Sequence, residues 1–200
     1  MSGRGSVSTE RGQAFTLEAV LASFIVIAGL VFALQAVTVT PSTTGSSAEP
    51  VEPAQLDRLL TESAESDTLR RAVLAWDGGF QGVLSGEDYF VDAFPDNEFG
   101  TALDEAVGPS VAVNVYVQYP TGPDSFERQR MVYNGLPGDG AVRAGTTVSV
   151  YDDDRLSDAT GSPRPGTSVG SDGLYPGFSD RSSSSDLYGV VTVEVVAWRA

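Results

Sequence analysis

The densest group of residues that could carry chemistry is a run of carboxylates, Asp152-Asp153-Asp154, followed by Asp158. Carboxylate oxygens are the ligands that Ca²⁺ and Mg²⁺ prefer, and a surface loop can wrap such an ion. The spacing differs from that of an EF-hand, whose ligands alternate and end on a glutamate. A solvated acidic turn is the simpler interpretation. We therefore expect no metal and no cofactor, and Asp152, Asp153 and Asp154 mark only the place where a weak Ca²⁺ site would lie.

Composition excludes most other catalytic chemistry. The chain has no Cys and no His, and all 12 of its basic residues are Arg. It therefore lacks a thiolate nucleophile, an imidazole base or metal ligand, and a lysine for Schiff-base chemistry. Paired carboxylates can hydrolyse glycosides, but a pair chosen from 27 acidic residues carries almost no information. We predict that the protein is not an enzyme, and a carboxylate-only hydrolase is the alternative.

Two arginines, Arg128 and Arg130, alternate within the segment FERQRMVYN at 126–134. If this segment is a strand, both side chains lie on one face, because successive strand residues point to opposite faces. Together they could bind an anion. In a chain this acidic, pairing with nearby carboxylates is the favoured interpretation.

The charge balance excludes one class of partner. The chain has 12 basic and 27 acidic residues and a net charge of −15, whereas nucleic-acid binding requires a basic patch. Its 41% hydrophobic content is sufficient for a core, and the acidic residues are scattered, so this is not a disordered acidic tail. Abundant Asp without Lys is typical of proteins from halophilic archaea. At molar salt the Debye length is about 3 Å, so repulsion between like charges farther apart than this is largely screened.

The sequence after residue 53 predicts helices packed on an antiparallel sheet. Apolar residues recur with helical spacing over 54–65 and 67–76, and a short helix is expected to end at Gly108. Alternating valines indicate strands, most clearly where Val111, Val113, Val115 and Val117 share one face. The expected strands cover 111–119, 126–134, 142–151 and 187–198, the first three as an antiparallel meander that the fourth completes. Residues 152–186 are expected to form a long loop of functional or disordered surface.

A long apolar run lies near the amino terminus. The 21 residues from Ala19 to Val39 carry no charge, and as a helix they would span about 31 Å, the thickness of a bilayer's hydrocarbon core. Arg4 and Arg11 precede the run, and no further Arg occurs before Arg58. By the positive-inside rule, the amino terminus would be cytoplasmic and the body extracellular, in a single-pass protein of the cell membrane.

The residues that precede the run, Arg11-Gly12-Gln13-Ala14-Phe15-Thr16-Leu17-Glu18, are distinctive. On its own, Glu18 fits a carboxylate at the start of a helix near the membrane interface. A basic leader, Arg-Gly, FTLE and a long apolar helix together resemble the signal of archaeal type IV prepilins. The protein thus resembles haloarchaeal pilin-like families of unknown function. One departure is that bacterial prepilins place one residue between Leu and Glu.

This resemblance implies roles for individual residues. A prepilin peptidase would cut after Gly12, or alternatively after Gln13, so Arg11, Gly12, Gln13 and Ala14 form the processing signal. Glu18 would then pair with the new α-amine of a neighbouring subunit. Gly29 and Ala33 form a small-xxx-small pair that lets helices approach closely, although alanine is common in any such helix.

The expected organisation has four parts: a cleaved cytoplasmic leader at 1–12, a transmembrane and assembly helix at 13–39, a linker at 40–53, and an extracytoplasmic acidic α+β domain at 54–200. The expected function is that of a type IV pilin-like structural subunit, a minor pilin or pseudopilin that binds the membrane and other pilin-like subunits or copies of itself. The alternative is a signal-anchored extracellular binding module that does not assemble.

Overall fold

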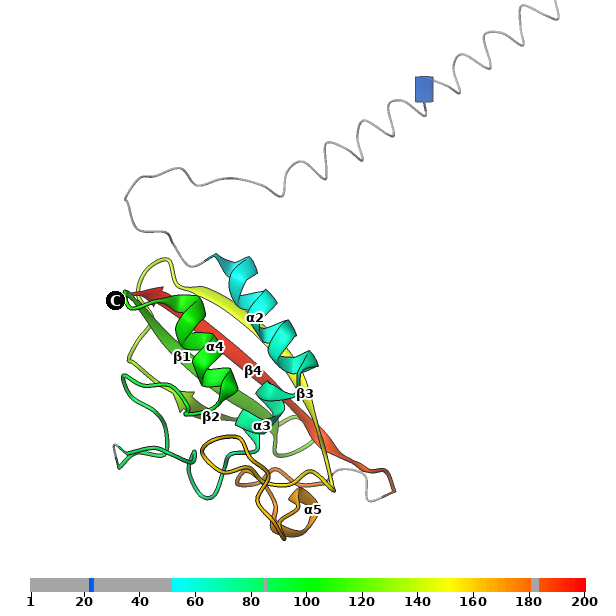
Figure 1. Cartoon of the computed structure of the whole chain (residues 1–200). Coiled ribbons are helices and arrows are strands. Elements are labelled where there is room, and N and C mark those ends of the chain that lie inside the picture. The colour runs from blue at the N-terminus through cyan, green and yellow to red at the C-terminus, as the bar shows by residue number, and fades with distance from the viewer. Residues whose placement is uncertain (1–21, 24–51, 85, 181–183) are drawn as a thin grey trace, which may run out of the picture. The chain divides into compact units, whose positions relative to one another are not determined.

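The computed structural model describes residues 22–23, 52–84, 86–180 and 184–200. The chain divides into two units, Met1–Ala48 and Glu49–Ala200, and the second contains the sheet and its helices (Figure 1). Its elements are, in chain order, α2 (Pro53–Glu65), α3 (Thr68–Val73), α4 (Glu98–Val107), β1 (Val111–Pro120), β2 (Phe126–Val132), β3 (Val142–Tyr151), α5 (Val169–Asp172) and β4 (Leu187–Arg199).

The helices begin and end where local chemistry favours it. Helix α2 has Pro53 at its start, where the missing N–H would have no helical partner. At the start of α4, the Asn97 side chain accepts a hydrogen bond of 3.0 Å from the Gly100 N–H. The same helix ends at Gly108, whose φ of 70° lies in the left-handed region that glycine adopts readily. The helices expected from apolar spacing are thus confirmed, with α3 shorter than predicted.

The four strands form one antiparallel sheet in the order β2-β1-β4-β3. All four expected strands are confirmed, but the expected meander is wrong, because β4 lies between β1 and β3. The physical reason is burial. Strand β4 carries Val195 and Val196 on opposite faces, both fully buried, whereas β2 carries the exposed Arg128 and Arg130. The strand that buries side chains on both faces takes the centre, and the strand with exposed arginines takes the edge.

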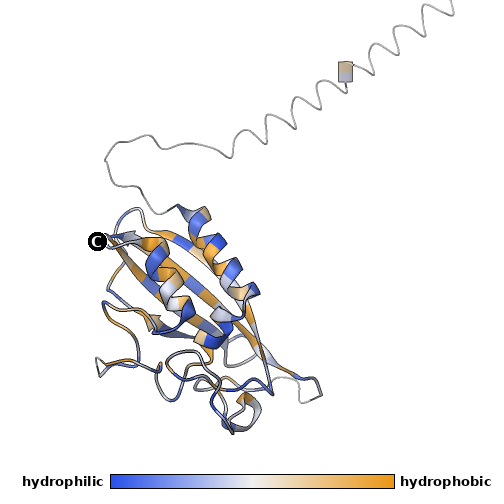
Figure 2. Ribbon diagram, viewed as in Figure 1, coloured by the Kyte–Doolittle hydropathy of each residue, from blue (hydrophilic) through white to orange (hydrophobic). Residues whose placement is uncertain are grey.

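Helices α2, α3 and α4 cover one face of the sheet (Figure 1). Figure 2 shows hydrophobic residues concentrated on the strands, with hydrophilic residues on much of the outer side of α2 and α4. The core between the layers is apolar, and its largest fully buried side chains include Phe99, Leu56, Leu60, Leu69, Leu103 and Met131. Burial of this apolar surface is the main force that holds helices to sheet.

The long connection between β3 and β4 packs on this core. Within 152–180 and 184–186 it is irregular apart from the single turn of α5, yet it buries Leu156, Val169, Tyr175 and Phe178. The Tyr175 hydroxyl donates a hydrogen bond of 2.6 Å to the Val73 carbonyl. Burial of the Tyr175 side chain raises the pKa of this hydroxyl well above its ordinary value. The expectation of a surface loop therefore missed the apolar contacts that this connection contributes.

The predicted transmembrane helix requires a correction. Among the described residues, no helix has both the length and the apolarity needed to cross a membrane. The longest of them, α2, has 13 residues, about 20 Å, and it is amphipathic, whereas a hydrocarbon core is about 30 Å thick. We therefore correct the fold class to a small α+β domain with a four-stranded antiparallel sheet, and withdraw the single-pass membrane location. Within 19–39, only Ala22 and Ser23 are described.

A prediction about packing follows from Gly100. A Cβ built at this position would lie 1.9 Å from the Pro95 carbonyl oxygen. Replacing glycine by alanine inside a helix usually stabilises it by about 1 kcal/mol. Here we expect Gly100→Ala to lower the free energy of unfolding by about 1–3 kcal/mol, because the backbone must shift. Denaturant unfolding measures this change.

Gly145→Ala is the matched control. Its Cβ would meet the Val193 carbonyl oxygen at 3.5 Å, an ordinary contact. We expect this variant to unfold within about 0.5 kcal/mol of the wild type. Equal unfolding free energies for the two variants would contradict the packing at Gly100.

Candidate functional site

The face of the sheet opposite the helices carries the most distinctive chemistry of the described domain. Its central residues are set by strand register, in which Tyr116 of β1 lies opposite Arg130 of β2 and Glu194 of β4. Tyr116 packs with Val196 and Trp198 in a small apolar cluster on this face. We call this surface the arginine–tyrosine face, and define it by Tyr89, Tyr116, Phe126, Arg128, Arg130, Tyr133, Arg143 and Glu194.

Glu194 holds two arginines of this face in place. Its carboxylate forms an ion pair with Arg128 from β2 and accepts a 3.1 Å hydrogen bond from Arg143 of β3. The Arg128 guanidinium also lies 3.5 Å from the centre of the Tyr116 ring, close enough for a cation–π contact. These side chains are partly exposed, so the ion pairs orient the arginines more than they stabilise the fold.

Arg130 is held differently. Its guanidinium lies 4.2 Å from the Tyr133 ring centre and 5.5 Å from that of Tyr89, and the two rings meet edge to face. No carboxylate of the described residues forms an ion pair with it. The expectation of carboxylate pairing is confirmed for Arg128 and wrong for Arg130, whose charge is stacked on tyrosines and available to an outside anion.

An exposed aromatic side chain lies next to these arginines. Phe126 begins β2 opposite Pro120 and is 62% exposed. Because it precedes Arg128 by two residues in a strand, it points to the same side of the sheet. Phe126, Arg128 and Arg130 therefore form a row along the edge strand, with one apolar and two cationic members.

Asn114 supports the face from within. This residue is fully buried, and its side-chain nitrogen donates to the Gly135 carbonyl at 2.8 Å and to the Tyr116 hydroxyl at 2.9 Å. Its side-chain oxygen accepts from the Asn134 N–H at 2.7 Å. These bonds fix the turn after β2 and the position of the Tyr116 ring. Sequence reasoning assigned no role to Asn114, and only its position among apolar neighbours on β1 gave a signal.

A second surface lies on the opposite side of the domain, between α2 and α4. It is a groove of about 550 Å³, which we call the helix groove. Its lining combines small or apolar side chains, Leu59, Ala102 and Ala106, with three carboxylates, Glu62, Glu98 and Glu105. Glu105 forms no ion pair within the described part of the chain, whereas Glu62 pairs with Arg58 at 2.9 Å. Arg58 also lines the groove, so the groove carries three carboxylates and one guanidinium beside its apolar side chains.

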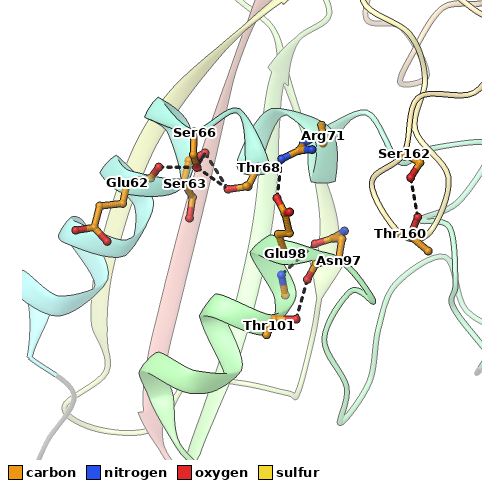
Figure 3. Close-up of polar contacts among 11 residues, drawn as sticks. Glu62, Ser63, Ser66, Thr68, Arg71, Asn97, Glu98, Thr101, Thr160 and Ser162 are labelled. Atoms are coloured by element: carbon orange, nitrogen blue, oxygen red, sulfur yellow. Dashed lines mark hydrogen bonds and ion pairs between the residues drawn. The ribbon is translucent and has the colours of Figure 1, made fainter.

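Hydrogen bonds hold the end of this groove together (Figure 3). The Ser66 hydroxyl donates to the Glu62 carbonyl at 2.8 Å, and the Thr68 hydroxyl donates to the Ser63 carbonyl at 3.1 Å. Arg71 of α3 reaches Glu98 at the start of α4 at 2.6 Å, and this ion pair joins the two helices. Figure 3 shows the Glu62 carboxylate extending away from this network.

The acidic cluster serves the loop that contains it. Asp154 accepts a 2.8 Å hydrogen bond from the Tyr151 N–H and lies 3.6 Å from Arg70. Burial, and then the nearby Asp180 and other carboxylates, raise the pKa of Asp152. Within the described residues, no three acidic side chains are arranged to hold a metal ion. Asp152, Asp153 and Asp154 are therefore not brought together as a Ca²⁺ site.

The predicted processing and assembly residues lie outside the described residues. They are Arg11, Gly12, Gln13, Ala14, Glu18, Gly29 and Ala33. Their roles stay predictions.

Comparison with known protein families gives a match over most of the chain. The model of a family of unknown function, DUF7288, matches residues 11–197, which include both the Arg11–Glu18 segment and nearly all of the folded domain. No curated protein and no solved structure matches the chain.

The Asn114 network generates a stability prediction. Asn114→Ala should lower the free energy of unfolding by about 2–3 kcal/mol, because buried partners lose their hydrogen bonds. Gln118→Ala, on the same face of β1 but exposed, should change it by about 0.5 kcal/mol or less. Chemical denaturation of both variants measures the difference. Similar losses in the two would show that the Asn114 network is unimportant.

The Asp158 turn generates a pH prediction. Its Oδ1 accepts hydrogen bonds from the Thr160 hydroxyl at 2.7 Å and from the N–H groups of Thr160 and Ser162, so the pKa of Asp158 is lowered. A carboxyl with a lowered folded-state pKa stabilises the fold above its unfolded-state pKa, and this contribution is lost as pH falls through the folded-state pKa. We expect the Asp158 carboxyl to titrate below 3.8 when followed by NMR.

The unfolding midpoint of Asp158→Asn should approach that of the wild type as the pH falls through this range, because the variant has no carboxylate to protonate. A midpoint difference that stays constant from neutral to acid pH would contradict the role of Asp158.

Proposed function

The chain belongs to this DUF7288 family, and we propose that it is a structural subunit of a pilin-like assembly. In this proposal, the apolar segment 13–39 packs against the same segment of other copies or of related pilin-like subunits. A prepilin peptidase removes residues 1–12. The folded domain is then displayed on the assembled segments.

One observation carries the proposal, namely the order of residues around Glu18. The segment Arg11–Glu18 resembles a prepilin signal, and it is followed by 21 residues without any charge. Cutting after Gly12 creates an ammonium group a few residues from this carboxylate. In apolar surroundings each charge is costly alone and much less so when paired. Glu18 of one subunit and the new amine of its neighbour supply that pair.

The folded domain fits a subunit that works through its surfaces. Its distinctive side chains, Phe126, Arg128 and Arg130, lie on an exposed sheet face and not in an enclosed cavity. Aromatic residues and arginine are enriched at protein interfaces, where large rigid or forked side chains contribute most. The same face also favours the second candidate function, a binding module that does not assemble.

Mass spectrometry of the chain isolated from its native cells tests the proposal. We expect Gln13 to be the first residue of the mature chain. Gly12→Val should block the cut, because a branched side chain replaces the small residue that the signal requires. Gly5→Val makes the same substitution within the leader and should leave processing unchanged.

Glu18→Gln separates processing from assembly. We expect this variant to lose residues 1–12 but to form no sedimenting assemblies, because the amine lacks its counter-charge. Glu10→Gln, the same change inside the leader, is the control and should assemble normally. A native chain that keeps Met1 or Ser2 would contradict the proposal and support the non-assembling module.

A further inference from the structure

We propose that the arginine–tyrosine face of one copy docks into the helix groove of the next copy. Phe126 would pack on the apolar residues of the groove, Leu59, Ala102 and Ala106, and Arg128 and Arg130 would meet its carboxylates. The inference rests on the proposed function, since it assumes that copies assemble, and it names the contact that the folded domains make.

The arginine–tyrosine face is prepared for an anionic, partly apolar partner. Phe126 is 62% exposed, so its burial on docking would remove a large apolar surface from water. Arg130 is already oriented by the Tyr133 ring at 4.2 Å, so little side-chain freedom is lost when it binds a carboxylate. It has no carboxylate partner among the described residues, so a partner carboxylate replaces no existing ion pair.

The helix groove has the matching chemistry. Leu59, Ala102 and Ala106 give it an apolar part, and α4 contributes Glu98 and Glu105. Glu105 is exposed and, within the described residues, has no ion-pair partner. One unpaired carboxylate on this surface thus complements one unpaired guanidinium on the other.

Net charge explains why the contact would use these two surfaces. Copies that each carry a charge of −15 repel one another, so two acidic surfaces cannot meet without cost. The arginine–tyrosine face has three arginines and one glutamate, and is therefore cationic within an acidic chain. Salt screening weakens long-range repulsion most, whereas ion pairs in direct contact within an interface are screened much less.

The two surfaces lie on opposite sides of one domain. Helices α2 and α4 cover one face of the sheet, and the arginine–tyrosine face is the other (Figure 1). A domain therefore cannot satisfy its own groove. A contact between different surfaces on each copy is heterologous, and it repeats in one direction to form an open chain unless the rotation closes it into a ring.

Cysteine cross-linking tests the contact in the full-length chain, which has no cysteine of its own. One tagged variant carries Gln118→Cys, which is exposed on the sheet face beside Arg128, and a differently tagged variant carries Ala106→Cys in the groove. We expect a short bifunctional maleimide to join the two variants. Asp172→Cys on α5 replaces Gln118→Cys as the control and should give no cross-link with Ala106→Cys. Absence of the mixed product, or an equal yield with the control, would overturn the docking.

Charge reversal provides a second test. Arg130→Glu should weaken sedimenting association at least about tenfold, the loss expected for a central interface arginine. Adding Glu105→Arg to the same chain should restore it, because the pair is then reversed. Arg155→Glu makes the same charge change away from the face and should leave association unchanged. Thermal unfolding of each variant shows whether it is folded.

The two proposals fail in different ways. If Glu18→Gln abolishes assembly while Arg130→Glu leaves it unchanged, the docking is overturned and the pilin-like function stands. If the mixed cross-link forms in chains that were isolated from the native cells and still keep residues 1–12, the docking is supported and the pilin-like function is overturned.

Discussion

The arrangement of the domain depends on the central strand β4. Its backbone pairs with β1 on one side over Thr192–Arg199 and with β3 on the other over Leu187–Ala197. Val193 and Val195 point toward the helices, and Val196 is buried on the opposite face. A strand that buries side chains on both faces is favoured at the centre of a sheet. Its position forces β2 to one edge and β3 to the other, which overturned the expected meander.

The same register arranges the charges. Glu194 of β4 lies opposite Tyr116 of β1, and it reaches Arg128 on one edge strand and Arg143 on the other. One carboxylate therefore orients two arginines, and the third, Arg130, is held by tyrosines. In a chain with more than twice as many acidic as basic residues, this is how a cationic surface persists. The helix groove on the other side keeps the prevailing negative charge.

Residues whose type suggested chemistry in the sequence have structural roles. Residues that belong to no motif instead form and support the surface with the most distinctive chemistry. Asp154 and Asp158 accept hydrogen bonds from their own loop, a common role for aspartate in turns. Asn114 and Tyr133, which carried no motif, organise the surface with the most unusual chemistry. Spacing along the chain identifies which side chains share a face, but the partner across the sheet depends on register.

By itself the sequence determined the local elements of the domain, because apolar period and turn residues act within a few positions. It placed α2, α4 and all four strands within a few residues and put Arg128 and Arg130 on one face. It also led to the expectation of a transmembrane helix, whereas none of the helices that the structure describes has the length and apolarity to cross a membrane. Only the tertiary structure decided the strand order, the interaction partners of Arg128, Arg130 and Arg143, and the groove between α2 and α4. These depend on contacts between residues far apart in the chain. In the sheet, β4 lies between β1 and β3, although it is the last strand in the sequence, because it buries side chains on both faces.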